Sequence, residues 1–159
     1  MKVKRKLPRS LLRAILLFSL SPVLWSPPLG AAEKGQPGVQ LKIGTILATN
    51  EADCLDSQLS KMKQQLERIK YRCYHLVKEE SQKASWLANS VFEIAGGRSL
   101  VVMPQEYRNN QISLKVRLLA GEKPIVDITV RVPNRGNFLL GGPAHEGGVL
   151  ILSISPMTQ

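Results

Sequence analysis

The sequence predicts an α+β domain in which one amphipathic helix packs on a mostly antiparallel sheet of about seven to eight strands. Three observations lead to this prediction. One stretch carries apolar residues at the helical period. Several later runs alternate between apolar and polar residues, which is typical of half-buried strands. Pairs of glycine or asparagine separate some of these runs, as expected of hairpin turns.

The first 32 residues have the layout of a secretory signal peptide. A basic start is followed by an apolar run at 11–25 and then by small residues. Residues 33–38 are predicted to form a flexible tether, and residues 39–156 a single domain. The alternative is an uncleaved membrane anchor. The apolar run, however, falls short of the roughly 20 residues that a span needs, and it contains Arg13.

Removal of this leader changes the charge of the chain. Six of the 22 Lys and Arg residues, and none of the 12 acidic residues, lie within residues 1–32. The processed chain then has 16 basic and 12 acidic residues, so its net charge is +4 instead of +10. The remaining basic residues are scattered among acidic ones without interleaved aromatic residues. Nucleic-acid binding is therefore not expected.

The predicted helix follows a first strand at 39–48. Asp56 is its expected N-cap, because a carboxylate accepts hydrogen bonds from the free amides of the first turn. An apolar stripe at spacings of three and four residues follows it: Leu59, Met62, Leu66 and Ile69. A second strand begins at Tyr71. We expect the two strands to pair in parallel through a right-handed crossover, with the helix covering the sheet.

The rest of the domain is predicted to consist of strands joined by short turns. Strands are expected at 71–77 and 84–95, separated by the polar stretch 78–80. The glycine pair 96–97 and the asparagine pair 109–110 mark hairpin turns, because these residues tolerate positive φ. Further strands are expected at 99–104, 112–119, 125–132, 137–140 and 149–155. Their clean alternation predicts an antiparallel sheet with one buried face and one wet face.

The segment 141–148 is the strongest candidate for a site. It places four glycines, a proline, a histidine and a glutamate between two apolar runs. A phosphate-binding loop would lead into a helix, whereas this segment leads into a β-like run. We therefore predict a loop between strands that serves as a recognition loop. Its residues are Gly141, Gly142, Pro143, His145, Glu146 and Gly147.

The sequence shows no assembled set of catalytic or metal-binding residues. His145 and Glu146 could ligate a metal, but a catalytic zinc usually needs three protein ligands. The other histidine, His75, falls within a predicted strand. No G-x-S-x-G nucleophile elbow occurs. We expect no catalytic residue, no cofactor and no metal.

Cys54 and Cys73 flank the predicted helix. About 14 helical residues would place them roughly 21 Å apart along the helix axis, and a strand returning from Cys73 recovers only part of that distance. The Cα atoms of a disulfide must lie within about 7 Å of each other. The crossover therefore predicts two free thiols. The alternative, a Cys54–Cys73 disulfide, would mean that the crossover is wrong.

The order of these motifs resembles small, uncharacterised exported proteins of Gram-negative bacteria. The match covers about residues 40–156 and includes the strand with Tyr71 and Tyr74, the Gly-Gly-Arg turn at 96–98 and the closing "GGPAHEGGVLILSI" hairpin. The resemblance implies a strand, a helix and a strand followed by antiparallel hairpins. Its motifs are turn glycines and core patterns, so it implies no catalytic residue.

Together these observations predict a non-catalytic, exported interaction or assembly module of the bacterial cell envelope, periplasmic or secreted. The expected partner is an envelope protein, with no nucleic acid and no stable membrane span after processing. An exposed sheet edge is the first surface expected to bind, and the loop 141–148 is the second. The alternative is a small secreted hydrolase or ligand-binding enzyme acting on envelope material. A third hypothesis is a membrane-tethered protein that keeps its leader.

Overall fold

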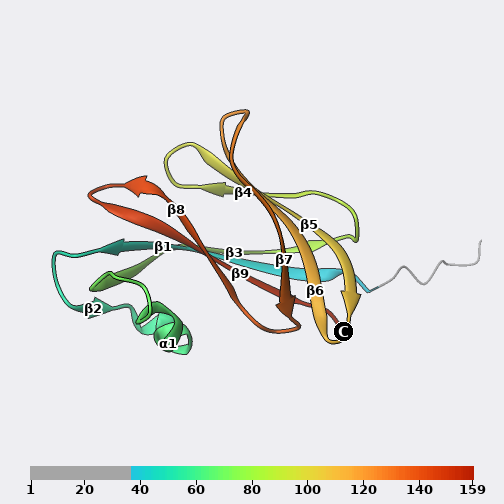
Figure 1. The fold of residues 1–159 in the computed structure, drawn as a ribbon, viewed down its shortest axis with the longest axis horizontal. Helices are drawn as coiled ribbons and strands as arrows, with labels where there is room; N and C mark the ends of the chain where they lie inside the picture. The colour runs from blue at the N-terminus through green and yellow to red at the C-terminus, as the bar shows by residue number, and fades with distance from the viewer. Residues whose placement is uncertain (1–36) are drawn as a thin grey trace, which may run out of the picture. The chain divides into compact units, whose positions relative to one another are not determined.

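A computed structural model describes residues 37–159, which form a sandwich of two β-sheets with one short helical segment (Figure 1). The predicted leader and most of the predicted tether lie outside the described residues. The elements in chain order are β1 (Val39–Thr49), β2 (Cys54–Leu55), the 3-10 helix η1 (Ser57–Met62), α1 (Lys63–Leu66), β3 (Cys73–Ala84), β4 (Ser90–Ile94), β5 (Arg98–Arg108), β6 (Gln111–Ala120), β7 (Lys123–Pro133), β8 (Phe138–His145) and β9 (Gly148–Met157).

The prediction of a helix packed on a single sheet is wrong. One sheet has five strands in the order β2-β3-β1-β9-β8, and the other has four in the order β4-β5-β6-β7. The helical segment consists of six residues of 3-10 helix and four of α-helix, so it covers only one end of one sheet. The alternating strands instead bury their apolar faces against each other across two layers, as in other sheet-on-sheet packings.

The main core lies between the two sheets. The predicted apolar face of β6 is confirmed, because its four inner residues are 0 % exposed: Ile112, Leu114, Val116 and Leu118. From the other sheet, β1 and its neighbour β9 contribute Val39, Leu41, Ile43, Leu150, Leu152 and Ile154. This core is therefore built from one face of each sheet.

β1 buries side chains on both of its faces at its C-terminal end. On its outer face, Lys42 is exposed, whereas Ile46 and Ala48, further along the same face, are 0 % exposed. They belong to a second core beneath the helical segment, whose other buried members are Leu59, Leu66, Tyr74 and Ile151. The helical segment thus covers the part of β1 where apolar residues occupy both faces.

Side-chain hydrogen bonds fix the helical segment at both ends. Asp56 is the N-cap, as predicted: its Oδ1 accepts from an amide of the first turn at 3.0 Å, and its Oδ2 accepts from the amide of Leu76 on β3 at 3.3 Å. At the other end, the hydroxyl of Tyr74 donates toward the carbonyls of Leu66 (2.9 Å) and Ile69 (3.0 Å). Burial raises the pKa of Tyr74, so this hydroxyl keeps its proton at neutral pH.

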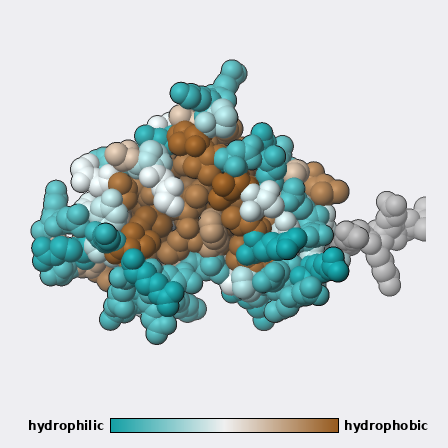
Figure 2. All heavy atoms as spheres, in the orientation of Figure 1, coloured by the Kyte–Doolittle hydropathy of each residue, from teal (hydrophilic) through white to brown (hydrophobic). Residues whose placement is uncertain are grey.

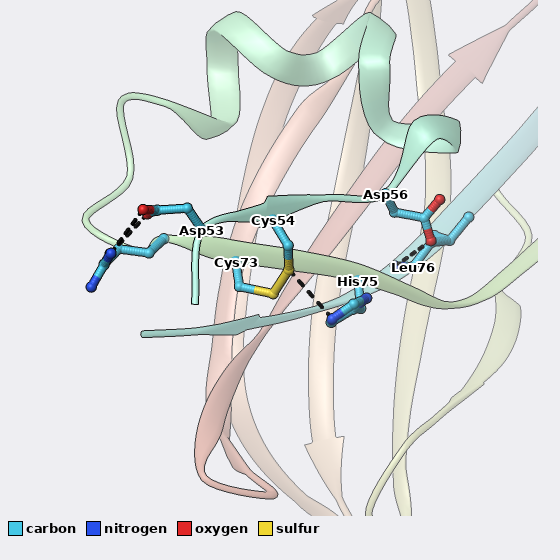
Figure 3. Close-up of a disulfide and its surroundings, with 7 residues drawn as sticks. Asp53, Cys54, Asp56, Cys73, His75 and Leu76 are labelled. Carbon is cyan, nitrogen blue, oxygen red and sulfur yellow. Dashed lines mark hydrogen bonds and ion pairs between the residues drawn. A yellow bond between two sulfur atoms is a disulfide. The ribbon is translucent and has the colours of Figure 1, made fainter. Parts of the chain in front are cut away.

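The predicted parallel crossover is also wrong, because β3 pairs with β1 in the antiparallel direction. The chain leaves β1, makes the excursion through β2 and the helical segment, and returns with Cys73 opposite Thr49. β2 pairs in parallel with the start of β3 and places Cys54 opposite Cys73. Their Cα atoms lie 4.3 Å apart and their sulfurs form a disulfide (Figure 3). The prediction of two free thiols fails with the crossover on which it depended.

Two predicted turns are confirmed, whereas the predicted break between strands at 78–80 is wrong. The residues at 96–97 and at 109–110 connect consecutive strands and have positive φ. The polar stretch 78–80 is not a turn, because it lies within β3. The chain instead reverses at 85–89, after β3 ends at Ala84.

Loss of the disulfide is expected to weaken the fold by releasing the excursion between β1 and β3. The double variant Cys54→Ser/Cys73→Ser should lower the free energy of unfolding by about 3 kcal/mol, because the disulfide joins residues 19 positions apart and limits the unfolded chain. Urea unfolding of the oxidised wild type and of the variant measures this change. The reduced wild type is the matched control and should unfold with the variant. Coincident unfolding of the variant and the oxidised wild type would contradict the expectation.

Candidate interaction surface

The predicted recognition loop is part of a β-hairpin. β8 extends to His145 and β9 begins at Gly148, so only Glu146 and Gly147 connect the two strands. Both connecting residues have positive φ, at 44° and 77°, as in a two-residue hairpin turn. The other residues of the predicted loop lie within β8: Gly141, Gly142, Pro143 and His145.

Two glycines of this hairpin are required by close backbone packing. A Cβ on Gly148 would collide with the carbonyl oxygen of Ala48 on β1. A Cβ on Gly142 would lie 2.8 Å from the carbonyl oxygen of Leu150. Gly147 instead provides the positive φ of the turn. Packing and turn geometry therefore account for three of the four glycines that made this segment resemble a binding loop.

The histidines lie in different settings. His145 Nε2 lies 3.6 Å from the carboxylate of its neighbour Glu146. His75 Nε2 lies 3.4 Å from Cys54 Sγ, beside the disulfide (Figure 3). Cys54, Cys73 and His75 form a group of possible metal ligands whose ligand atoms lie within 4.8 Å of one another. Because the two sulfurs are bonded to each other, this group has no thiolate, which is the form of cysteine that binds metals.

An ion pair lies on the other side of the disulfide. Arg72 donates two hydrogen bonds to the carboxylate of Asp53, both at 2.8 Å. These hydrogen bonds and the charge of Arg72 hold the pKa of Asp53 below its usual value. Both side chains are more than half exposed, so solvent screens the pair and its contribution to stability is small.

Three larger surface cavities lie on the described part of the chain. The cavity beside the disulfide has a volume of about 440 Å³ and contains the carboxylates of Asp53 and Glu67, of which the first is paired with Arg72. Two further cavities, of about 470 and 520 Å³, are lined near the chain end by Thr158 and Gln159. No histidine lines any of these three cavities, so none has a histidine base beside a nucleophile.

The edges of the two sheets differ in how well they are protected. β2 is an edge of only two residues, and beyond it the edge passes to β3, which is irregular at Val77 and carries the charged run 78–80. β8 is interrupted by a bulge between Gly141 and Ala144 and contains Pro143, which has no amide hydrogen. Short strands, bulges, charged side chains and prolines are common devices against the addition of a further strand. β4 is protected by side chains of another strand.

Polar side chains of β3 cap the free edge of β4. Gln82 Nε2 donates to the carbonyl of Val91 at 3.0 Å, and Lys78 Nζ donates to the carbonyl of Glu93 at 3.3 Å. The carboxylate of Glu80 holds both donors, with Gln82 and Lys78 each at 2.8 Å. Hydrogen bonds from Lys78 and then from Gln82 lower the pKa of Glu80. This capping explains why a polar stretch that resembles a turn continues as a strand.

β7 presents a free edge that is regular from Val126 to Val132. The amide of Asn134 donates to the carbonyl of Asn110, just beyond the last pair of the β6–β7 ladder. Because residues in an antiparallel ladder alternate in direction, the even-numbered residues of 126–132 direct their backbone groups toward β6. The odd-numbered residues direct theirs to the free edge: Asp127, Thr129 and Arg131. Within residues 37–159 no side chain is hydrogen-bonded to these outward groups.

The apolar face of β7 is incompletely covered. Leu114, Val116 and Leu118 of β6 are 0 % exposed, whereas their partners in the ladder are partly exposed. These partners are Val130, Ile128 and Val126. Figure 2 shows hydrophobic residues gathered across the middle of the face that carries β7 and β8. The main core is therefore open to solvent beside an unpaired strand edge, which we name the β7 edge (residues 126–132).

The alternating sequence at 125–132 predicts a strand but does not identify its edge as a candidate site. A signal is present, because Pro124 and Pro133 bound the run and charged residues alternate with apolar ones between them. Proline within a sheet is confined largely to edges, strand ends and bulges. The capping residues of β3 carried no comparable signal.

Comparison of the chain with protein-family models, with curated proteins and with solved structures finds no match. The resemblance to exported proteins therefore stays a prediction. Within residues 37–159, no helix has the length and apolar character needed to cross a membrane.

The stabilising role of Glu80 should depend on pH. The pKa of Glu80 is lower in the folded state than in the unfolded chain. The contribution of its carboxylate to stability is therefore fully present above the ordinary glutamate pKa of about 4.3, and it is lost as pH falls through the lower pKa of the folded state. Glu80→Gln should therefore lower the melting temperature most near neutral pH and progressively less in acid. Thermal unfolding of both proteins at a series of pH values measures this difference.

The exposed turn residue Glu122 provides the control for this experiment. Glu122→Gln also changes a carboxylate to an amide, but no described ion pair or side-chain hydrogen bond involves it. It should not reproduce the pH-dependent difference. A Glu80→Gln effect of the same size at every pH would show that the carboxylate charge is not what stabilises the cap.

The two kinds of glycine in the β8–β9 hairpin should respond differently to a methyl group. Gly148→Ala should lower the free energy of unfolding by about 1 to 3 kcal/mol, because its Cβ meets backbone of β1 that cannot move easily. Gly141→Ala is the matched control, because its Cβ meets open space, and it should change stability by less than about 0.5 kcal/mol. Denaturant unfolding measures both. Equal effects would refute the close-packing explanation.

Proposed function

We propose that the protein is a non-catalytic interaction module of the bacterial cell envelope, periplasmic or secreted, which binds a partner by adding a strand at the β7 edge. The observation that carries this proposal is the coincidence of two features on one strand. Backbone groups at Asp127, Thr129 and Arg131 face the free edge, and the apolar residues between them are only partly buried. In strand addition, main-chain hydrogen bonds provide affinity and apolar contacts beside them provide specificity.

The other strand edges of the two sheets are protected against pairing, which supports the β7 edge as the binding surface. A long unpaired edge invites aggregation, and proteins usually blunt it. Here β2 is short, the edge of β3 beyond it is irregular and charged, β8 is bulged, and β4 is capped by Gln82 and Lys78. Retention of a regular edge at residues 126–132 beside these blunted ones is expected where that edge has a use.

The proposed periplasmic or secreted location is supported by the disulfide and by the N-terminal sequence. The disulfide Cys54–Cys73 is compatible with an oxidising environment, in which disulfides persist. The leader-like residues 1–32 and the net charge of +4 that remains after them support an exported protein without a nucleic-acid partner. The proposed partner is accordingly an envelope protein.

Proline at the centre of the β7 edge tests the proposal. Thr129→Pro removes an outward-pointing amide and breaks no hydrogen bond to β6, so the sandwich should survive. The matched control, Thr129→Val, keeps this amide and favours a strand. The wild type and both variants carry the same tag, are cross-linked in intact cells, and are recovered from detergent-free periplasmic extract for mass spectrometry.

The proposal expects one reproducible cross-linked partner with the wild type and with Thr129→Val, and at least about a tenfold loss of it with Thr129→Pro. Thermal unfolding of the purified variants shows whether each is folded. Capture that is unchanged in a folded Thr129→Pro protein would exclude the β7 edge as the binding surface. Recovery of the wild type without any cross-linked product, including one of two copies of the chain, would refute the function as an interaction module.

A further inference from the structure

The partner strand can be specified further, in an inference that rests on the proposed use of the β7 edge. We propose that the strand that pairs with β7 is β7 of a second copy of this chain, antiparallel to it and centred on Thr129. The result is a two-fold symmetric dimer in which the two four-stranded sheets join into one. The inference comes from the sequence of the β7 edge, VDITVRV, which is self-complementary when paired with its own reverse.

The register follows from the backbone. Thr129, Asp127 and Arg131 all direct their backbone groups outward. When Thr129 lies opposite Thr129 of the second copy, Asp127 lies opposite Arg131 of the second copy, and the reverse pair completes the symmetry. All three facing pairs can exchange amide-to-carbonyl hydrogen bonds. A shift by one residue would place outward backbone groups opposite inward ones and would end this exchange.

The charges on the solvent face agree with this register. In a single copy, Asp127 lies 3.6 Å from Lys115, and Arg131 lies 3.8 Å from Glu106. These are loose ion pairs between side chains that are 40 to 70 % exposed, so they do little to hold the charges away from the edge. In the dimer, each Asp127 gains Arg131 of the other copy directly across the ladder. Opposite charges at facing positions stabilise an antiparallel pair.

The apolar side chains on the inner face of β7 also agree with this register. In the same register, Ile128 lies opposite Val130 of the second copy, and Val126 lies opposite Val132. These are β-branched residues, which pack well across neighbouring strands. Because Val126, Ile128 and Val130 are partly exposed in one copy, the pairing extends the main core across the two-fold axis. One register thus matches backbone groups, charges and apolar side chains.

The ends of the β7 edge limit the contact to this register. Pro133 has no amide hydrogen for a ladder, and the ladder is irregular between Val126 and Pro124 at the other end. Only the residues 126–132 therefore remain for pairing. A two-fold contact uses the same surface on both copies and closes on itself, so it yields dimers and no longer assemblies. A single strand pair also buries less than the roughly 1,600 Å² of a standard interface, so the dimer should dissociate on dilution.

Complementary charge reversal tests the dimer. Asp127→Lys places a lysine opposite Arg131 of the second copy, and Arg131→Glu places a glutamate opposite Asp127, so each variant alone juxtaposes like charges twice. In a mixture of the two variants, a mixed dimer pairs the introduced lysine with the introduced glutamate and keeps one native pair of Asp127 with Arg131. Sedimentation of the purified, processed proteins over a wide concentration range gives the dissociation constant of each variant and of the equimolar mixture.

The inference expects a dissociation constant at least about tenfold higher for each single variant than for the wild type, and recovery in the mixture. Glu122→Lys, a charge reversal in the turn outside the paired register, should leave dimerisation unchanged. Thr129→Pro should abolish it, and Thr129→Val should not. Melting temperatures show whether each variant is folded.

A wild type that stays monomeric at all concentrations would overturn the inference. So would folded single variants that dimerise as the wild type does, or a mixture that recovers nothing. If the purified protein is monomeric while Thr129→Pro still loses a different captured protein in cells, only the identity of the partner is wrong and the proposed function stands. If Thr129→Pro also leaves capture in cells unchanged, the proposal that the β7 edge binds a partner is refuted.

Discussion

The antiparallel pairing of β1 with β3 and β9 is the constraint on which the rest of the structure depends. β1 is the central strand of the five-stranded sheet, with the second sheet on one face and the helical segment on part of the other. Side chains along a strand alternate between faces, so a shift of one residue would move Leu41 and Ile43 out of the main core and Lys42 into it. Both cores and the meeting of the two cysteines therefore follow from one register.

The sequence allowed prediction of features that single residues impose on their own neighbourhood. Asp56 caps the helical segment because its carboxylate reaches the free amides of the first turn. Asn109 and Asn110 adopt the positive φ that a tight hairpin requires. The alternation in β6 fixes which of its side chains are buried. None of these features depends on what lies across the core.

The arrangement of layers could not be predicted in this way, because alternation indicates a buried face without indicating what covers it. The helical stripe favoured a covering helix, but the segment is short and most of the burial comes from a second sheet. The direction of β3 relative to β1 decided whether Cys54 could meet Cys73, and no local residue specifies that direction. The polar stretch 78–80 indicated a break between two strands, although Lys78 lies within β3 and, with Gln82, caps the edge of a strand in the other sheet. The β7 edge was not predicted, because a free edge is defined by the absence of a neighbouring strand. That absence can be seen only in the three-dimensional structure.

The pairing of β1 with β9 places Gln40 opposite Met157 and so joins the two ends of the described chain. A chain that is delivered N-terminus first cannot complete the five-stranded sheet until its last strand arrives, because contacts between distant residues must wait for the closure of the longest loop. The β1–β3 hairpin needs only local closure, so the cysteines can meet and oxidise while β9 is still absent. Until then, the side of β1 that faces β9 is an open edge. Arrival of β9 thus completes the five-stranded sheet: a chain that stops short of it leaves its central strand unpaired on one side and lacks the residues that β9 adds to the core between the layers.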